Sequence, residues 1–236
     1  RGLRYLKDYK NFKVVEIPSS PLIKKNLFKF FYSSLTIFFS IIKSFLFLLF
    51  NKPILIIGMG GYASFPICIA ASILRIKFII YESNLVLGKA NKYLLPFTQK
   101  IFVSYKELEG IPDRYIKKVV EVGNIIRDEI INFKGKKIDI EKFEDIKILV
   151  LGGSQAAKVF AEQLPQIFEK FKKTDFPIKI YQQCLREQNS QLIEFYKKTQ
   201  IDFEIFNFTN EIADYYSKAN IVITRSGASV LGELVN

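Results

Sequence analysis

The sequence has 236 residues, 49% of them hydrophobic, and this composition excludes a grossly disordered chain. The length allows one large domain or two small ones. The net charge is +12 and there is no histidine, which excludes histidine-bound zinc and Ser-His-Asp catalysis built from this chain alone. The basic excess favours nucleic acid, anionic lipid or phosphorylated substrates as partners, and a lysine-rich genome composition accounts for part of it.

The two cysteines, Cys68 and Cys184, lie far apart in apolar or strand-like stretches. We expect buried free thiols in a reducing compartment, with no disulfide framework and no metal-binding spacing. The first residue is arginine, no signal-peptide pattern follows it, and the last residues have a helical pattern. We therefore expect the chain to be truncated at both ends.

The N-terminal stretch is unusually apolar. Residues 13–17 predict a short strand, which Pro18 and Pro21 end. Residues 22–50 are then dense in Phe, Leu and Ile, with lysine as their charged residue. The longest run without charge, 30–42, is shorter than the ~20 residues of a membrane-spanning helix. A helix partly buried in the domain and partly dipping into a membrane surface is therefore favoured over a transmembrane helix, with an ordinary core helix as the alternative.

A glycine turn follows the next strand. The consecutive apolar residues Ile54–Ile57 indicate a strand covered on both faces. Gly58-Met-Gly-Gly-Tyr62 comes next and precedes a helix predicted over 63–74. This order supplies flexible backbone and unpaired N–H groups to an anion or a sugar. It recurs at 146–157, where Gly152-Gly-Ser154 follows an apolar strand. Such turns are as often structural, and neither has dinucleotide or P-loop spacing.

Apolar runs and helical patterns alternate to the end of the sequence. They predict strands over 77–81, 101–104, 119–122, 146–151, 178–183, 203–206 and 221–224, and helices over 91–95, 155–172, 187–198, 210–218 and from 228. This alternation indicates two α/β domains with parallel sheets and right-handed crossovers, facing one cleft.

Polar residues follow several of the predicted strands. Glu82-Ser-Asn84 and Gly123-Asn-Ile-Ile-Arg127 each follow a strand, and Arg225-Ser-Gly-Ala-Ser229 opens the last helix. Glu233 lies on the same helix face as Ser229, where a carboxylate can accept two ribose hydroxyls. The structural alternatives are a solvated Glu233, a helix-capping Ser154 and an Arg127 that pairs with an interdomain carboxylate.

Taken together, these motifs resemble the MurG family of peptidoglycan glycosyltransferases. The motifs are Gly58-Met-Gly-Gly-Tyr62, Tyr81-Glu-Ser-Asn84, Gly123-Asn-Ile-Ile-Arg127, Gly152-Gly-Ser-Gln155 and Arg225-Ser-Gly-Ala-Ser-x-x-x-Glu233. The resemblance runs from about residue 13 to the end. It implies an α/β, GT-B fold of two Rossmann-like domains with parallel sheets. Residues 1–126 would form an incomplete acceptor- and membrane-binding domain, and 127–236 an incomplete UDP-sugar domain.

The resemblance also implies an activity. It is inverting, metal-independent and cofactor-free transfer of N-acetylglucosamine from UDP-N-acetylglucosamine to lipid I, which gives lipid II for peptidoglycan. The expected partners are these two substrates and an anionic membrane surface, with no nucleic acid. The expected location is peripheral, on the cytoplasmic face of the bacterial inner membrane. The alternatives are another lipid-acceptor GT-B glycosyltransferase and a non-catalytic membrane-binding module.

The resemblance assigns individual residues as well. Asn84 would contact the donor sugar, Arg127 would bind donor from the hinge, Ser154 would hold the diphosphate and Thr209 would lie by the uracil. The residues that would line the nucleotide are Ala228, Ser229, Val230, Leu231, Gly232 and Glu233, with Glu233 taking the ribose hydroxyls. The residues of the acceptor side would be Gly60, Gly61 and Tyr62.

The sequence departs from the family in several places. The family's Gly-Gly-Thr-Gly-Gly-His loop is absent, so the catalytic residue stays unassigned. Tyr81-Glu-Ser-Asn84 keeps only the Glu and Asn of the family's His-Glu-Gln-Asn. Ala156 replaces a glycine, and Val230 stands where the family often has threonine. A later donor-binding glutamine is also missing. We therefore expect this polypeptide to be an inactive fragment of the enzyme.

Overall fold

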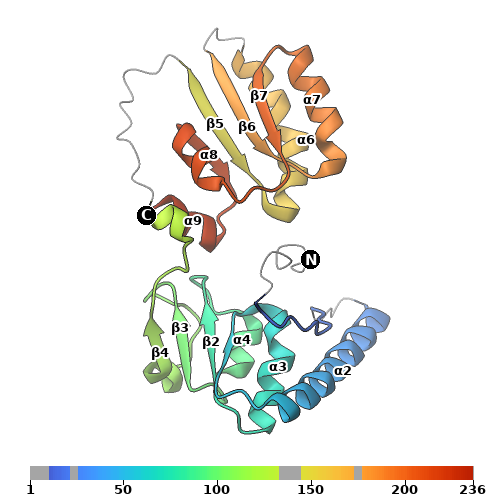
Figure 1. The fold of residues 1–236 in the computed structure, drawn as a ribbon, viewed down its shortest axis with the longest axis vertical. Helices are drawn as coiled ribbons and strands as arrows, with labels where there is room; N and C mark the ends of the chain where they lie inside the picture. The colour runs from blue at the N-terminus through green and yellow to red at the C-terminus, as the bar shows by residue number, and fades with distance from the viewer. Residues whose placement is uncertain (1–10, 22–25, 133–144, 173–176, 236) are drawn as a thin grey trace. The chain divides into compact units, whose positions relative to one another are not determined.

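The computed structural model describes residues 11–21, 26–132, 145–172 and 177–235, except for the side chains of 154–157 and 172. The chain divides into a first unit, residues 1–124, and a second unit, residues 125–236. Each unit contains its own parallel four-stranded sheet (Figure 1). Two α/β units with parallel sheets confirm the architecture that the alternating pattern predicts.

The first unit follows the predicted order of strands and helices. Its elements are α2 (Leu27–Asn51), β1 (Ile56–Gly58), α3 (Gly61–Ile73), β2 (Phe78–Glu82), α4 (Lys89–Leu94), β3 (Lys100–Val103), a 3₁₀ helix (Asp113–Lys118) and β4 (Val119–Glu121). The sheet order is β1-β2-β3-β4, and every neighbouring pair is parallel. All four carboxyl ends therefore lie at one edge of the sheet, which is where open parallel sheets bind ligands.

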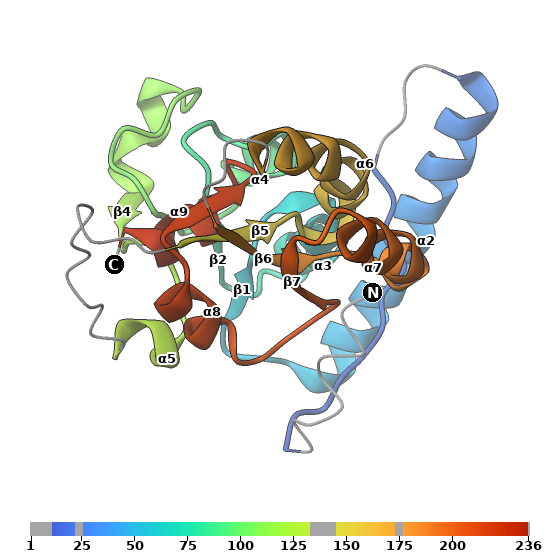
Figure 2. The ribbon, with the colours of Figure 1, turned by 90° about the horizontal axis from the view of Figure 1, so that it is seen from above.

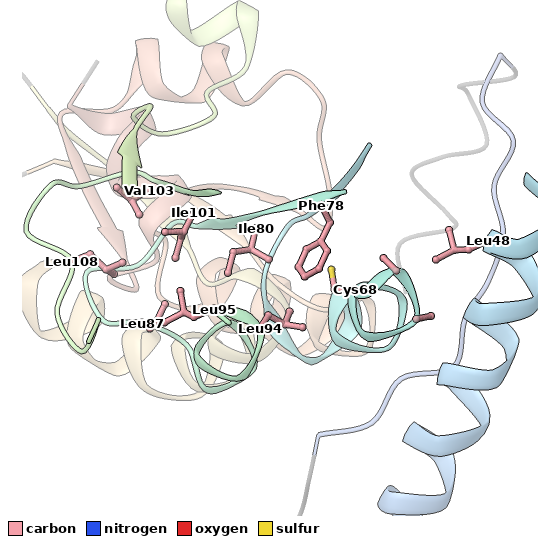
Figure 3. Close-up of a cluster of buried hydrophobic side chains, with 12 residues drawn as sticks. Leu48, Cys68, Phe78, Ile80, Leu87, Leu94, Leu95, Ile101, Val103 and Leu108 are labelled. Carbon is pink, nitrogen blue, oxygen red and sulfur yellow. The ribbon is translucent and has the colours of Figure 1, made fainter. Parts of the chain in front are cut away.

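The core of the first unit lies between the sheet and helices α3 and α4. Phe78 and Ile80 of β2 and Ile101 of β3 point toward these helices, where Cys68 and Leu94 meet them (Figure 3). All five side chains are essentially inaccessible to solvent. Strands and helices fixed by this packing hold the loops at the carboxyl edge in place.

Helix α2 buries several small polar side chains and exposes many large apolar ones, unlike a helix of the core. It packs on α3 (Figure 1, Figure 2), and the side chains it buries include the small polar residues Ser33, Ser40 and Ser44. Its exposed side chains are large and apolar: Leu27, Phe28, Phe30, Phe31, Tyr32, Leu35, Phe38, Phe39, Ile42, Leu46, Leu49 and Phe50. By length and composition alone, α2 is long and apolar enough to cross a membrane. The alternative of an ordinary core helix is wrong.

Two local predictions in this unit are also wrong. Residues 13–17 form no strand, because the segment runs along α2, where Lys13 approaches Asn51 and the Ser40 hydroxyl donates to the Pro18 carbonyl at 2.6 Å. The run Ile54–Ile57 is not a strand buried on both faces. Among the described strands, β1 is an edge strand paired only with β2, and Ile54 and Ile57 are 93% and 57% exposed.

The second unit repeats the alternation on its own sheet. Its elements are α5 (Asp128–Ile131), β5 (Ile146–Leu151), α6 (Gly153–Lys172), β6 (Ile178–Gln183), a 3₁₀ helix (Arg186–Gln188), α7 (Asn189–Lys198), β7 (Asp202–Phe206), α8 (Ile212–Lys218), β8 (Ile221–Thr224) and α9 (Ala228–Leu234). The sheet order is β7-β6-β5-β8, all parallel. The central strand β5 therefore lies between β6 and β8.

Both faces of the second sheet are covered. Because side chains alternate along a strand, Ile148 and Val150 of β5 pack with α6 and α7, while Leu149 and Leu151 pack with α5, α8 and α9. Figure 2 shows α6 and α7 beside each other. The unbroken apolar sequence of β5 is thus explained by burial on both sides.

The prediction that both cysteines are buried free thiols is confirmed. Cys68 and Cys184 are free and buried, one in each unit. Burial raises the pKa of the Cys68 thiol to about 12, and burial together with the nearby Glu187 raises that of Cys184 to about 11. Both thiols stay protonated at neutral pH and are poor nucleophiles.

Candidate functional site

The predicted site residues gather at the carboxyl edges of the two sheets. In the first unit, Gly60, Gly61 and Tyr62 follow β1, and Asn84 follows β2. In the second unit, residues follow β5, β7 and β8 in the same way: Ser154, Thr209 and Ala228–Glu233. Because each sheet is parallel, the loops of each group share one edge of their own sheet.

Gly60 makes the turn after β1 possible. Its φ is +76°, and a Cβ there would lie 3.0 Å from the Tyr81 carbonyl oxygen and 3.3 Å from Asn91 Nδ2. Only glycine combines that conformation with that approach. Gly60 is the N-cap residue of α3 and makes no side-chain hydrogen bond to the first turn of the helix. The backbone N–H groups of that turn therefore remain available to a ligand. Tyr62 is exposed beside them.

A buried carboxylate organises the loop after β2. The four residues of this Glu82 network are Glu82, Asn84, Gly88 and Asn91. Glu82 Oε1 accepts from the Asn84 backbone N at 3.2 Å and from Asn84 Nδ2 at 2.7 Å. Glu82 Oε2 accepts from the Gly88 N at 2.8 Å and from Asn91 Nδ2 at 3.0 Å. Four neutral N–H groups thus fill the roughly four acceptor positions of one carboxylate.

The Glu82 network links two predicted site elements. Asn91 also donates to the Tyr81 carbonyl at 3.2 Å, next to Gly60, and Glu82 holds the exposed Asn84 on its other oxygen. Asn84 is exposed, and its Nδ2 group, which carries two N–H donors, gives one of them to Glu82. Gly60 thus lies close to Asn91, a member of the Glu82 network that also holds Asn84.

The second glycine turn is held by a neighbouring strand. Gly153 has a φ of +57° and begins α6, and its N–H donates to Gln183 Oε1 at 3.2 Å. Gln183 ends β6 and also donates to the Asn207 carbonyl at 3.3 Å. Ser154 lies in the first turn of α6, and its side chain is outside the described residues.

A second carboxylate has a different set of partners. The three residues of this Glu233 cluster are Arg127, Tyr216 and Glu233. Arg127 Nε lies 3.2 Å from Glu233 Oε1, and Tyr216 Oη donates to Glu233 Oε2 at 2.9 Å. The Glu233 side chain is only 7% exposed, whereas that of Arg127 is 49% exposed. Two residues that the sequence assigns to donor binding are therefore in contact.

The Tyr216 hydroxyl is a permanent donor in this cluster. Burial, the adjacent Glu233 charge and the hydrogen bond to it raise the Tyr216 pKa, against a smaller lowering by Arg127. The hydroxyl consequently stays protonated throughout the physiological range.

The remaining predicted residues lie nearby in the second unit. Thr209 is half-buried ahead of α8, and its Oγ1 accepts from the Glu211 backbone N at 2.9 Å. In α9, Ser229 and Leu231 are exposed, Ala228 is half-buried, Gly232 is buried and Val230 packs against the apolar cluster around Leu149 and Ile212.

Sequence reasoning missed several residues of these networks, namely Gly88, Asn91, Gln183, Asn207 and Tyr216. Asn91 lies in α4 and Tyr216 in α8, and neither forms part of a glycine motif. Gln183 is the last residue of a predicted strand, and open parallel sheets bind ligands at that end of their strands. Its position could therefore have identified it as a site residue.

Two family models match the chain. The glycosyltransferase family 28 N-terminal domain matches residues 3–103, and the glycosyltransferase family 28 C-terminal domain matches residues 147–236.

Curated relatives share one name. A UDP-N-acetylglucosamine–N-acetylmuramyl-(pentapeptide) pyrophosphoryl-undecaprenol N-acetylglucosamine transferase from Pelagibacter ubique is 34% identical over 99% of this chain. The transferase of the same name from Rickettsia canadensis is 37% identical over 79% of this chain. The chain spans 64% of the length of the first relative and 53% of the second.

Solved structures agree on the fold. The crystal structure of Acinetobacter baumannii MurG has a TM-score of 0.63 at 23% identity, covering 96% of this chain and 60% of that one. The Neisseria meningitidis UDP-GlcNAc 2-epimerase bound to UDP-GlcNAc has a TM-score of 0.56 at 17% identity, covering 89% of this chain and 62% of that one. At these identities the likeness concerns the fold alone, and it confirms the predicted GT-B class.

Proposed function

Because the chain belongs to glycosyltransferase family 28, we propose that it is part of an enzyme that transfers N-acetylglucosamine from UDP-N-acetylglucosamine to lipid I. Lipid I is undecaprenyl-diphospho-N-acetylmuramoyl-pentapeptide, and the product is lipid II for peptidoglycan synthesis. The observation that carries the proposal is 34% identity to a transferase of that name over 99% of the chain. The reaction breaks the bond between the anomeric carbon and the UDP diphosphate, forms a glycosidic bond to an acceptor hydroxyl that loses its proton, and releases UDP.

The second unit is the proposed donor-binding domain. Charge develops on the UDP diphosphate as the sugar leaves, and the N-terminus of the long helix α6 supplies N–H groups and a partial positive charge for it. Ser154 lies in that turn. In this proposal Glu233 accepts the ribose hydroxyls, Arg127 supports the nucleotide, and Thr209 with Ala228–Glu233 lines it. Their common position at one sheet edge supports this assignment.

The first unit is the proposed acceptor-binding domain. Gly60, Gly61 and Tyr62, with the uncapped start of α3, would face the diphosphate of the lipid acceptor. The exposed Asn84 amide, which is oriented by its hydrogen bond to Glu82, would contact the donor sugar.

Helix α2 is the proposed membrane contact. Its exposed aromatic face, with the exposed Lys29 and Lys43, suits insertion into the headgroup region of an anionic bilayer. An exposed apolar surface of this kind marks an interaction site. The enzyme would then act as a peripheral protein on the cytoplasmic face of the bacterial inner membrane, where its lipid acceptor lies.

A transfer assay tests the reaction. The intact protein, given UDP-[14C]N-acetylglucosamine and lipid I in detergent, is expected to produce labelled lipid II. Diacylglycerol offered in place of lipid I tests the alternative of another lipid-acceptor glycosyltransferase. Labelling of diacylglycerol and not of lipid I would overturn the proposed acceptor, and labelling of neither would overturn the reaction.

Vesicle co-sedimentation tests the membrane contact separately. The variant Phe31→Ser/Phe38→Ser/Phe39→Ser is expected to lose most binding to phosphatidylglycerol-containing vesicles, since it removes three exposed rings of α2. Phe97→Ser removes an exposed ring outside α2 and serves as the matched control. Equal binding by both variants would contradict the assignment of α2.

A further inference from the structure

The Glu233 carboxylate is held from two sides by residues distant in the chain. Arg127 directly precedes α5 and reaches Oε1, and Tyr216 lies in α8 and reaches Oε2. Among the residues that the structure describes, each oxygen therefore has one partner. A carboxylate offers about four acceptor positions, so about two remain for a ligand.

The two anchors differ in how firmly they can hold the carboxylate. The Arg127 side chain is long and 49% exposed, so solvent competes for it. The Tyr216 ring is half-buried and packs against the apolar cluster that includes Leu149 and Ile212. The tyrosine ring has only two side-chain torsions, so packing easily fixes its position. The terminal torsion of glutamate has no narrow preference, so the carboxylate can rotate unless a partner holds it. The Tyr216 hydroxyl is therefore the contact that determines how the carboxylate is turned.

We propose that Tyr216 is a positioning residue for nucleotide recognition, holding Glu233 so that its free acceptor positions meet the two ribose hydroxyls. The inference rests on the proposed function, in which Glu233 accepts those hydroxyls. Tyr216 itself contacts Glu233 and not the nucleotide.

This role has a distinctive signature. A residue that acts through Glu233 affects only the part of the affinity for UDP that comes from hydrogen bonds between the ribose hydroxyls and Glu233. Removing the Tyr216 hydroxyl should therefore lower the preference for UDP over 2′-deoxy-UDP, and not merely weaken both ligands equally.

Calorimetric titration of the intact protein with UDP and with 2′-deoxy-UDP measures this preference. The unsubstituted protein is expected to prefer UDP by about tenfold, the worth of one charge-assisted hydrogen bond. Tyr216→Phe keeps the ring and removes the hydroxyl. It is expected to weaken UDP binding by about fivefold and to reduce the preference to about threefold.

Two comparisons separate positioning from a structural effect. Tyr215→Phe is the matched control on the same helix, because the Tyr215 hydroxyl donates to Glu204 at 2.6 Å and its ring stacks on Phe206. It should leave the preference unchanged. In a protein carrying Glu233→Gln, adding Tyr216→Phe should change the preference by much less than it does alone, because coupled residues are not additive.

The outcomes distinguish the inference from the function it rests on. If the unsubstituted protein fails to bind UDP, both are overturned. If it binds UDP with the expected preference but Tyr216→Phe retains that preference, the proposed function stands and the role of Tyr216 is overturned. An equal loss of both ligands in Tyr216→Phe also overturns the positioning role.

Discussion

Glu82 and Glu233 are two buried carboxylates at the carboxyl edges of two similar sheets, yet they are satisfied differently. Glu82 is 4% exposed and accepts four hydrogen bonds from neutral N–H groups. The Glu233 side chain is 7% exposed and, within the described part of the chain, has one partner on each oxygen, Arg127 and Tyr216. The acceptor positions of Glu82 are filled within its own loop, whereas in our proposal Glu233 keeps about two of its acceptor positions for a ligand. Two buried carboxylates can therefore differ in how many acceptor positions they leave open for a ligand.

Glu82→Gln should have the largest effect. The amide nitrogen of the new glutamine would replace one carboxylate oxygen and would face N–H donors in either orientation. These donors are those of Asn84 on one side, or those of Gly88 and Asn91 on the other. We expect the free energy of unfolding of the first unit to fall by about 3 kcal/mol, measured by denaturant unfolding. Glu107→Gln, an exposed site in the same unit, should change it by less than about 0.5 kcal/mol. Equal stability of the two variants would contradict the structural role of the Glu82 carboxylate.

The same substitution at Glu233 should affect binding more than stability. Glu233→Gln keeps an oxygen for one protein partner but loses the charge that favours hydroxyl and guanidinium donors. We expect UDP affinity to fall by about tenfold in calorimetry. UDP affinity should be unaffected by Glu82→Gln at a temperature where both units are folded. If both substitutions weakened UDP binding alike, the comparison would fail.

Arg127→Gln should have the smallest effect on stability. Its side chain is half-exposed, so the ion pair with Glu233 is weakened by solvent and salt. We expect thermal unfolding at physiological salt to report a change below about 1 kcal/mol. A loss as large as that of Glu82→Gln would show that Arg127 is essential to the burial of Glu233, and that the two carboxylates are both structural.

Much of the fold was predictable because its signals are local. The predicted strands from 77–81 to 221–224 each overlap a strand of the structure, since short apolar runs between turn residues specify buried parallel strands. The failures at 13–17 and 54–57 share a cause. An apolar run does not say which neighbours will cover it, and these segments meet helix α2 and a sheet edge respectively.

The sequence by itself determined the order of strands and helices, the two glycine turns and the motifs that mark family 28, because these depend on residues near one another in the chain. Only the tertiary structure decided which face of α2 is exposed, that Glu82 is saturated and that Tyr216 holds Glu233. The partners of a carboxylate come from separate elements, such as α5, α8 and α9 around Glu233. Hydrogen-bond satisfaction is a property of the folded arrangement, and no local pattern encodes it.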